Sequence, residues 1–276
     1  MDSKLIFFDI DGTLAMEPSG IIPDSTRTAI AGAKRNGHQV FVNTGRTYYS
    51  ISEEIRSMDF DGYVCGCGTH IYYRGKKLLE SAIPHDMCVK VAKMLRDAKI
   101  PVFYEADKAI YFDFSYPNPW LQEAIQIFAA KGRNIEELFR DENQTYDKCL
   151  IFLPDTEAAG EIKVFLDEHF YCIPRGGNVW EVTQKDYTKA TGIRFMCSHL
   201  DADMENCFAV GDSENDLDML KAVKNSIAMG NAKEEILPYC SYVTKGIEED
   251  GIHDAHCHAQ LIKINYQTQD TLLNNQ

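Results

Sequence analysis

The sequence predicts a mixed α/β fold: a doubly wound, Rossmann-like parallel sheet with a smaller α+β cap domain inserted into it. Two observations carry this prediction. Near both ends of the chain, short apolar runs alternate with amphipathic helical stretches, which is typical of βαβ units. In the middle, aromatic strand-like runs mix with helices instead. We therefore expect a core domain at residues 1–82 and 184–276, and an inserted cap domain at residues 83–183.

The N-terminal elements are expected in the order strand, helix, strand, helix, strand. Residues 5–10 (LIFFDI) form a continuous apolar run before an Asp-Gly pair, which is typical of a buried parallel strand. Asp24 offers a helix start, and Gly37 offers a helix end preceded by basic residues. After this helix we expect a strand, a helix and a strand at residues 38–43, 50–58 and 62–65.

The central part is expected to open with a hairpin over residues 71–79 and a helix over residues 84–98. Its further strands are predicted at residues 102–105, 110–114, 150–153 and 179–182, and its further helices at residues 120–128 and 156–169. The alternating pattern then returns. There we expect helices at residues 188–199 and 214–223, and strands at residues 207–210, 226–228 and 242–244.

Composition and charge exclude some classes of partner. The chain has 276 residues, of which 45% are hydrophobic and 25% are charged, so a sizeable core is expected. Its 28 Lys and Arg residues and 42 Asp and Glu residues give a net charge of −14. Nucleic acids and anionic membranes are bound through clustered Lys and Arg, so we expect neither as a partner. An anionic substrate would have to be attracted locally, by a metal ion or a few cations.

The cysteines and the N-terminus indicate the cytoplasm. Nine cysteines without a repeating spacing are typical of small buried hydrophobic residues in a reducing compartment. The opening MDSKLIFFDI has too short an apolar run for a secretory signal, and no run of about eighteen uncharged apolar residues suggests a membrane span. We expect a cytoplasmic monomer or homodimer.

Two aspartates follow the first apolar run. Asp9 and Asp11 are one residue apart, so on an extended chain their side chains point to the same side. Gly12 then allows a sharp turn. An Asx turn alone would also explain an Asp-Gly pair. However, ligands bind at the carboxyl ends of parallel strands in open α/β sheets, so these carboxylates are candidates for chemistry.

A second acidic motif follows the apolar run at residues 208–210. Asp212 stands at its end, where a helix N-terminus explains part of the pattern. If Asp212 lies near Asp9 and Asp11, the three provide the oxygen ligands that Mg²⁺ prefers. Without a cation, each pair of like charges about 4 Å apart would cost about 4 kcal/mol at an effective dielectric constant of 20. The sequence therefore predicts a Mg²⁺ site.

Four more residues suit an oxyanion. Thr44 follows a predicted strand and can donate a hydrogen bond, and Gly45 permits close approach of the backbone. Arg46 can bind an anion through two parallel hydrogen bonds. Lys189 begins a predicted helix. Taken singly these signals are weak, because a turn explains the first three and exposure to solvent is the usual state of a lysine.

Together these segments resemble the haloacid dehalogenase (HAD) superfamily of phosphatases, specifically the Cof-like hydrolases with a class II type B cap. The similarity extends from end to end of the chain. Two departures are Asn43, where Ala or Ser is commoner, and Ala190, where Gly is usual; neither removes a reactive group. The matching motifs are DIDGTL at 9–14, NTGR at 43–46, TKATGI at 188–193, GDSENDLDML at 211–220, IAMGNA at 227–232 and EEDGIHDA at 248–255.

The resemblance implies a Mg²⁺-dependent phosphoric monoester hydrolase that acts on a small phosphorylated metabolite, such as a sugar phosphate, a nucleotide or a cofactor phosphate. The position of Asp9 is the nucleophile that forms an aspartyl-phosphate, and that of Asp11 is the general acid and base. The other roles that the resemblance implies are as follows: Thr44 and Lys189 hold the phosphoryl group; Gly45, Arg46 and Asn215 bind substrate; Asp9, Asp11 (through its backbone carbonyl) and Asp212 bind the metal; and Asp216 supports them.

Two other functions stay open at this point. Phosphomannomutase-type phosphomutases share the DxDGT start, and they would regenerate a sugar bisphosphate instead of releasing phosphate. A non-catalytic ligand-binding protein on this fold would normally lack the nucleophile or the lysine, yet Asp9 and Lys189 are both present.

The histidines near the C-terminus form a weaker candidate for metal binding. His253 and His256 would share one face of a helix, from which His258 turns away. We expect them to form a surface cluster.

Overall fold

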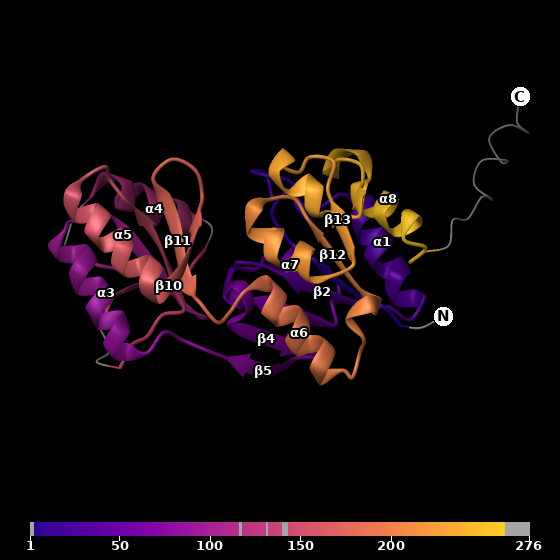
Figure 1. The fold of residues 1–276 in the computed structure, drawn as a ribbon, viewed down its shortest axis with the longest axis horizontal. Helices are drawn as coiled ribbons and strands as arrows, with labels where there is room; N and C mark the ends of the chain where they lie inside the picture. Colours follow the sequence, from indigo (N-terminus) through magenta and orange to yellow (C-terminus); the bar gives the residue numbers. More distant parts are fainter. Residues whose placement is uncertain (1–2, 116–117, 131, 140–142, 263–276) are drawn as a thin grey trace, which may run out of the picture. The chain divides into compact units, whose positions relative to one another are not determined.

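The computed structural model describes residues 3–115, 118–130, 132–139 and 143–262 (Figure 1). The chain forms two compact units. The first comprises residues 1–41, 58–60 and 201–276, and the second comprises residues 42–57 and 61–200. The predicted domain boundaries at residues 82–83 and 183–184 differ from this division and remain a prediction.

The first unit is built on parallel strands in the order β14-β13-β12-β1. Strands β1 and β12 are buried along their whole length, as their continuous apolar sequences require. Helices α1 and α8 lie side by side (Figure 1). The bounds are β1 Leu5–Phe8, α1 Asp24–Arg35, β12 Cys207–Gly211, α7 Leu217–Ala222, β13 Asn225–Ala228, β14 Tyr242–Val243 and α8 Gly251–His258.

The second unit contains the end of β2 and the antiparallel strands β3, β4 and β5. Helix α6 packs closely against β3. A Cβ atom on Gly192 would lie 2.3 Å from Cγ1 of Val64, so only glycine permits this approach. The bounds are β2 Gln39–Asn43, β3 Gly62–Cys65, β4 His70–Tyr73, β5 Lys76–Glu80 and α6 Lys189–His199.

The same unit also holds a six-stranded sheet in the order β10-β11-β9-β6-β7-β8, which is antiparallel except between β7 and β8. Successive residues of β6 enter different cores: Tyr104 packs with α3 and α5, and Phe103 packs with α4. The bounds are α3 His85–Asp97, β6 Val102–Glu105, β7 Ile110–Phe112, α4 Pro119–Ala130, β8 Ile135–Glu137, β9 Lys148–Phe152, α5 Glu157–His169, β10 Phe170–Pro174 and β11 Val179–Gln184.

Most predicted elements occur within a few residues of their expected ends, and the exceptions have local causes. The helix predicted at residues 50–58 is a 3₁₀ turn, Tyr48–Ser50, and a separate short helix α2, Glu53–Arg56, which begins where the Ser52 side chain caps it. Residues 214–223 are likewise divided into Glu214–Asp216 and α7. Strands β8 and β10 were not predicted, and α8 is the helix around His253 for which no bounds were predicted. The remaining 3₁₀ turns are Gly66–Gly68, Met204–Asn206, Glu234–Tyr239 and Ile247–Glu249.

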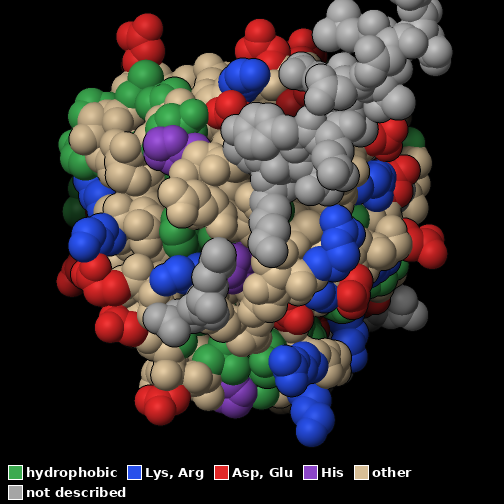
Figure 2. Space-filling model, turned by 90° about the vertical axis from the view of Figure 1, so that its right-hand side faces the viewer, with side chains coloured by type: hydrophobic (Ala, Val, Ile, Leu, Met, Phe, Trp, Pro, Cys, Tyr) green, Lys and Arg blue, Asp and Glu red, His purple; other side chains and the backbone are tan. Residues whose placement is uncertain are grey.

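Charged side chains of both signs are interspersed on the surface. On the face shown in Figure 2, Asp and Glu side chains are spread widely, with Lys and Arg among them. In the part of the chain that the structure describes, no helix combines the length and the apolar character needed to cross a membrane.

Candidate active-site residues

Asp9 stands directly after β1, and the chain turns sharply behind it. Its backbone N–H donates to the Val210 carbonyl at 3.0 Å, which continues the pairing of β1 with β12, and only 3% of the residue is exposed. Gly12 has a φ of +76°, and a Cβ there would lie 2.4 Å from a carboxylate oxygen of Asp212. Gly12 is therefore required both by the turn and by the close approach of Asp212.

Asp212 and Asp216 face the same region from the end of β12. Thr13 donates to Oδ1 of Asp212 at 2.9 Å, which orients that carboxylate. Asp216 is fully buried, and its Oδ2 accepts hydrogen bonds from the backbone N–H groups of Asp212 and Ser213 at 2.9 and 3.0 Å. Asp216 thus fixes the loop that carries Asp212.

This carboxylate cluster fits a hard divalent cation. Asp9, Asp212 and Asp216 each offer one oxygen, and these oxygens all lie within 4.8 Å of one another. Asp9 and Asp216 are buried, so their charges are little screened by water. Three carboxylates this close repel one another strongly, and Mg²⁺ favours oxygen ligands of this kind. The donor set therefore agrees with the predicted metal; it includes the Asp216 side chain, and the carboxylate of Asp11 is not part of it.

In the second unit, Thr44, Gly45 and Arg46 form a tight loop after β2. Thr44 is buried, and its backbone N–H donates to the Val64 carbonyl at 2.9 Å. Its Oγ1 accepts a hydrogen bond from the Arg46 backbone N–H at 3.2 Å, so the hydroxyl hydrogen can turn toward another acceptor. The loop presents a hydroxyl and a guanidinium group within three residues.

Lys189 is held at the N-terminus of α6. It is 1% exposed, and Thr188 and Thr191 form a reciprocal capping box around the helix start. The Asn43 side chain donates to the Lys189 carbonyl at 2.9 Å. Asn43 therefore ties the Thr44 loop to the lysine helix, which gives a physical role to one of the two departures from the usual motif.

A buried charged cluster on the six-stranded sheet lies beside the Thr44 loop. Glu181 on β11 is 1% exposed and pairs with Lys148 at 2.8 Å and with Nε of Arg175 at 2.7 Å. A Cβ on Gly45 would lie 3.4 Å from Oε1 of Glu181 and 3.6 Å from Nη2 of Arg175, so this glycine leaves room for the cluster. These residues were not predicted from the sequence, because Lys148 is far along the chain from Arg175 and Glu181 and no motif links them.

The charges in this cluster shift one another's pKa values. Burial would raise the pKa of Glu181, but Lys148 and Arg175 lower it to about 2. The pKa of Lys148 is raised because Glu105 and Glu181 outweigh the effect of its burial. Burial and then Glu181 raise the pKa of the Cys67 thiol to about 12. Glu181, Lys148 and Arg175 are therefore charged at neutral pH, and Cys67 is a neutral thiol.

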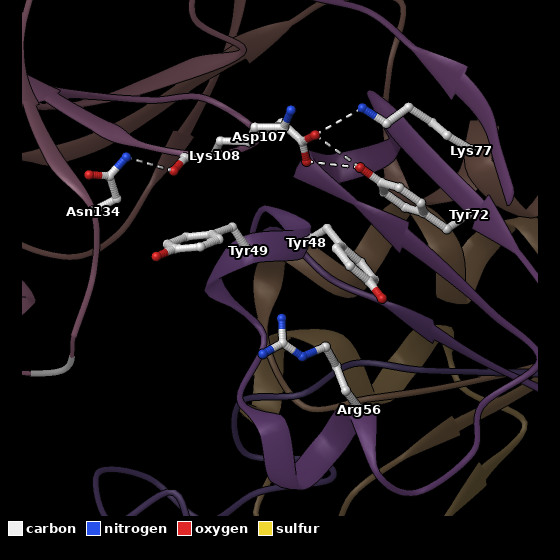
Figure 3. Close-up of a pocket in the computed structure, with 8 residues that line it drawn as sticks. All are labelled: Tyr48, Tyr49, Arg56, Tyr72, Lys77, Asp107, Lys108 and Asn134. Atoms are coloured by element: carbon white, nitrogen blue, oxygen red, sulfur yellow. Dashed lines mark hydrogen bonds and ion pairs between the residues drawn. The ribbon is translucent and has the colours of Figure 1, made fainter. Parts of the chain in front are cut away.

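A pocket of about 600 Å³ lies in the second unit (Figure 3). It is lined in part by Tyr48 and Tyr49, which follow the Thr44 loop in the sequence. Tyr48 stacks on Tyr72 with ring centroids 4.3 Å apart, and the Arg56 guanidinium lies 5.9 Å from the Tyr48 ring centroid. Across the pocket, Asp107 accepts hydrogen bonds from Tyr72 and Lys77. The pocket is aromatic with a largely cationic rim; its lining residues are Tyr48, Tyr49, Arg56, Tyr72, Lys77, Asp107, Lys108 and Asn134.

The residues indicated by the sequence thus fall into two groups. In the first unit, the structure brings Asp9, Asp212 and Asp216 together, and Asn215 accepts a hydrogen bond from Ser213 in the same loop. Asp11 is half-buried, and its carboxylate is not part of the carboxylate cluster found among the described residues. In the second unit the structure brings together the Thr44 loop, comprising Thr44, Gly45 and Arg46, and Lys189.

Comparisons with known proteins agree with this geometry. A family profile described as haloacid dehalogenase-like hydrolase matches residues 6–255. YkrA of Bacillus subtilis strain 168 is 29% identical over 261 residues, which cover 91% of this chain and 96% of YkrA. The 5-amino-6-(5-phospho-D-ribitylamino)uracil phosphatase YcsE of the same organism is 26% identical over 94% of this chain and 96% of its own length.

Solved structures show the same fold. The HAD subclass IIB sugar phosphatase BT4131 superimposes with a TM-score of 0.80 and 28% sequence identity, over 94% of this chain and all of that one. A haloalkanoate-superfamily phosphatase of Bacteroides thetaiotaomicron, BT1666, superimposes with a TM-score of 0.81 at 22% identity. The predicted fold class, a parallel-sheet α/β core with an inserted cap, is confirmed.

Proposed function

The chain belongs to the haloacid dehalogenase-like hydrolases and is a phosphoric monoester hydrolase, and from this premise we propose that it dephosphorylates a small metabolite through an aspartyl-phosphate on Asp9, with Mg²⁺ as cofactor. The observation that carries the proposal is the carboxylate cluster of Asp9, Asp212 and Asp216 at the ends of neighbouring parallel strands. Ligand sites in open α/β sheets lie at such strand ends.

Asp9 is proposed to attack the phosphorus atom. The new bond joins an Asp9 carboxylate oxygen to phosphorus, while the bond from phosphorus to the leaving oxygen breaks. Asp11 begins protonated and gives its proton to that oxygen, so the leaving group departs as an alcohol. As a carboxylate, Asp11 then takes a proton from the water that attacks the aspartyl-phosphate. Free phosphate and the original Asp9 carboxylate result.

The remaining residues are proposed to bind and orient. Thr44 and Lys189 hold the phosphoryl oxygens, the hydroxyl as a hydrogen-bond donor and the ammonium as a charge. Asp9, Asp212 and the backbone carbonyl of Asp11 would hold Mg²⁺, and Asp216 positions Asp212. When bound, Mg²⁺ supplies positive charge that offsets repulsion between the phosphate and these carboxylates.

The organic part of the substrate is proposed to be a sugar, a nucleoside or a cofactor-like group. Two similar proteins support this breadth: BT4131 is described as a sugar phosphatase, and YcsE as a phosphatase of a ribitylaminouracil phosphate. A screen of phosphorylated sugars, nucleotides and cofactor phosphates, with free phosphate as the readout, tests the proposal. Release of phosphate from none of them, with an aryl phosphate also inert, would refute it.

Removal of the metal is expected to abolish turnover. Because the carboxylates of Asp9, Asp212 and Asp216 lie within 4.8 Å of one another, a dianionic phosphate should not approach them without a compensating cation. We expect no phosphate release after exhaustive chelation and full recovery with added Mg²⁺. Excess Ca²⁺ should inhibit, because its larger shell fits this site poorly. Undiminished activity in the chelated protein would contradict the metal assignment.

A further inference from the structure

Arg133, which precedes β8, reaches the segment that follows the Thr44 loop. Its Nη1 donates to the Tyr49 carbonyl at 3.0 Å, and its Nη2 donates to the Ser50 carbonyl. The side chain is only partly exposed. A cation from the six-stranded-sheet part of the unit is therefore fixed beside the phosphate-binding motif by two main-chain contacts.

Arg46 reaches the same carbonyl oxygen. Its Nη1 lies 3.5 Å from the Ser50 carbonyl, the acceptor that Arg133 also uses. Two guanidinium groups thus converge on one oxygen atom. Burial and then the charge of Arg46 lower the pKa of Arg133, with Arg56 acting in the same direction. The repulsion between the two guanidinium groups disfavours the charged form of Arg133, and an anion bound between them would offset it.

Two acidic side chains of the same unit, Glu105 and Glu181, pair with other cations. Lys148 lies 3.3 Å from Glu105 and 2.8 Å from Glu181, and Arg175 also pairs with Glu181. Glu105 attracts Arg133 at longer range. Within the described ranges, however, the hydrogen bonds of Arg133 go to main-chain carbonyls, and it forms no ion pair with a carboxylate.

We propose that Arg46 and Arg133 form a subsite for a second anionic group of the substrate, a carboxylate or another phosphate, beside the phosphoryl group that is transferred. This inference rests on the proposed phosphatase function, and it narrows the substrate class to phosphate esters with a second acidic group. A planar guanidinium group can donate two parallel hydrogen bonds to the oxygens of such a group. The two main-chain contacts of Arg133 fix its side chain before the ligand binds. The organic part of the substrate would extend toward the pocket that Tyr49 lines.

The test compares two ligands that differ in one group, 3-phosphoglycerate and glycerol 3-phosphate, by calorimetric titration in the presence of Mg²⁺. The protein carries Asp9→Asn so that neither ligand turns over. We expect 3-phosphoglycerate to bind at least about 10-fold more tightly, since hydrogen bonds to charged groups contribute this much or more. Arg133→Gln should weaken its binding about 10- to 100-fold and change glycerol 3-phosphate binding by less than about 3-fold.

A matched control is Arg96→Gln. Arg96 is an exposed arginine of α3 paired with Asp113, so its loss removes a cation of the same unit without touching the Thr44 loop. It should change neither affinity. If Arg133 merely braced the 49–50 segment, its replacement would weaken both ligands equally. Equal weakening of both ligands by Arg133→Gln would contradict the proposed subsite. Equal affinity of the two ligands for the protein that retains Arg133 would also contradict it.

Failure of this inference and failure of the proposed function give different results. The binding comparison does not require turnover, so it measures the contribution of the subsite to affinity even if the protein releases no phosphate. Conversely, phosphate release from an aryl phosphate with no preference for a second anionic group would retain the phosphatase and reject the arginine subsite.

Discussion

Replacement of Asp9 by asparagine is expected to reduce phosphate release from 4-nitrophenyl phosphate by at least about 10⁴-fold, since removal of a covalent nucleophile has effects of that order or larger. Asparagine matches aspartate in size, and the backbone bond from residue 9 to Val210 does not involve the side chain. The fold should therefore be retained while the attacking oxygen is lost. Phosphate release is measured at saturating substrate and Mg²⁺.

Asp24→Asn serves as the control for this prediction. Asp24 is an exposed acid in the first turn of α1, in the same unit as Asp9. It should keep activity within about 2-fold, as usual for surface substitutions. If Asp9→Asn retained a tenth or more of the activity, Asp9 would not be the nucleophile.

Replacement of Glu181 by glutamine is expected to destabilise the second unit by about 3–5 kcal/mol, the range found when one partner of a buried ion pair is removed. Lys148 is 5% exposed and would lose its shorter carboxylate contact. Arg175 would lose the carboxylate that holds both its Nε and its Nη2. Both tryptophans, Trp120 and Trp180, lie in this unit, so urea unfolding followed by their fluorescence reports on it directly.

The stabilisation from Glu181 should also depend on pH. The pKa of this group is 4.5 in its ordinary state and about 2 in the folded protein. A lowered pKa means that the stabilisation is fully present above about pH 4.5 and is lost as the pH falls toward 2. Between these values the difference in unfolding free energy between the wild type and Glu181→Gln should therefore shrink.

The exposed pair on α5 provides the control for Glu181. Lys163 and Asp167 are four residues apart on the helix, and Asp167 is half exposed. Asp167→Asn should change the free energy of unfolding by no more than about 1 kcal/mol. If Asp167→Asn and Glu181→Gln changed the free energy of unfolding equally, burial would add nothing to the stabilisation that the Glu181 ion pairs provide.

The proximity of Asp9 and Asp212 could be expected from the sequence because local rules determine it. Asp9 and Asp212 each follow an apolar run that is buried on both faces, and parallel strands place such ends at one edge of a sheet. Gly12 and Thr13 follow Asp11 directly in the sequence, but their contacts with the Asp212 carboxylate required the structure. The same reasoning indicated Thr44, whereas Lys189 was indicated by the resemblance to the HAD family, and the contact of Asn43 with the Lys189 carbonyl required the structure.

The rest depended on contacts between residues distant in sequence. Glu181 meets Lys148 because β11 pairs with β9, and no periodicity within either strand reveals that pairing. Arg133 follows α4 in a loop without a motif. The prediction of a surface histidine cluster was wrong for His256. That residue is fully buried, lies beside Phe8 and contacts the Ala29 carbonyl, and burial lowers its pKa to about 4.

The central claim assigns different roles to two neighbouring carboxylates, Asp9 and Asp11, and labelled phosphate distinguishes them. Asp11→Asn retains the nucleophile but loses both proton transfers, each of which contributes about 10²–10⁴-fold. An aryl phosphate scarcely needs a proton on its leaving group, so it should still phosphorylate Asp9 in this variant. Hydrolysis of the intermediate should lag behind.

The most direct measurement is therefore the amount of ³²P-labelled phosphate bound to protein after acid quenching of each variant with a labelled aryl phosphate. We expect Asp11→Asn to accumulate an acid-stable, hydroxylamine-labile acyl-phosphate, and Asp9→Asn to retain no label. Equal labelling of the two variants would contradict the assignment of Asp9 as the nucleophile and Asp11 as the acid and base.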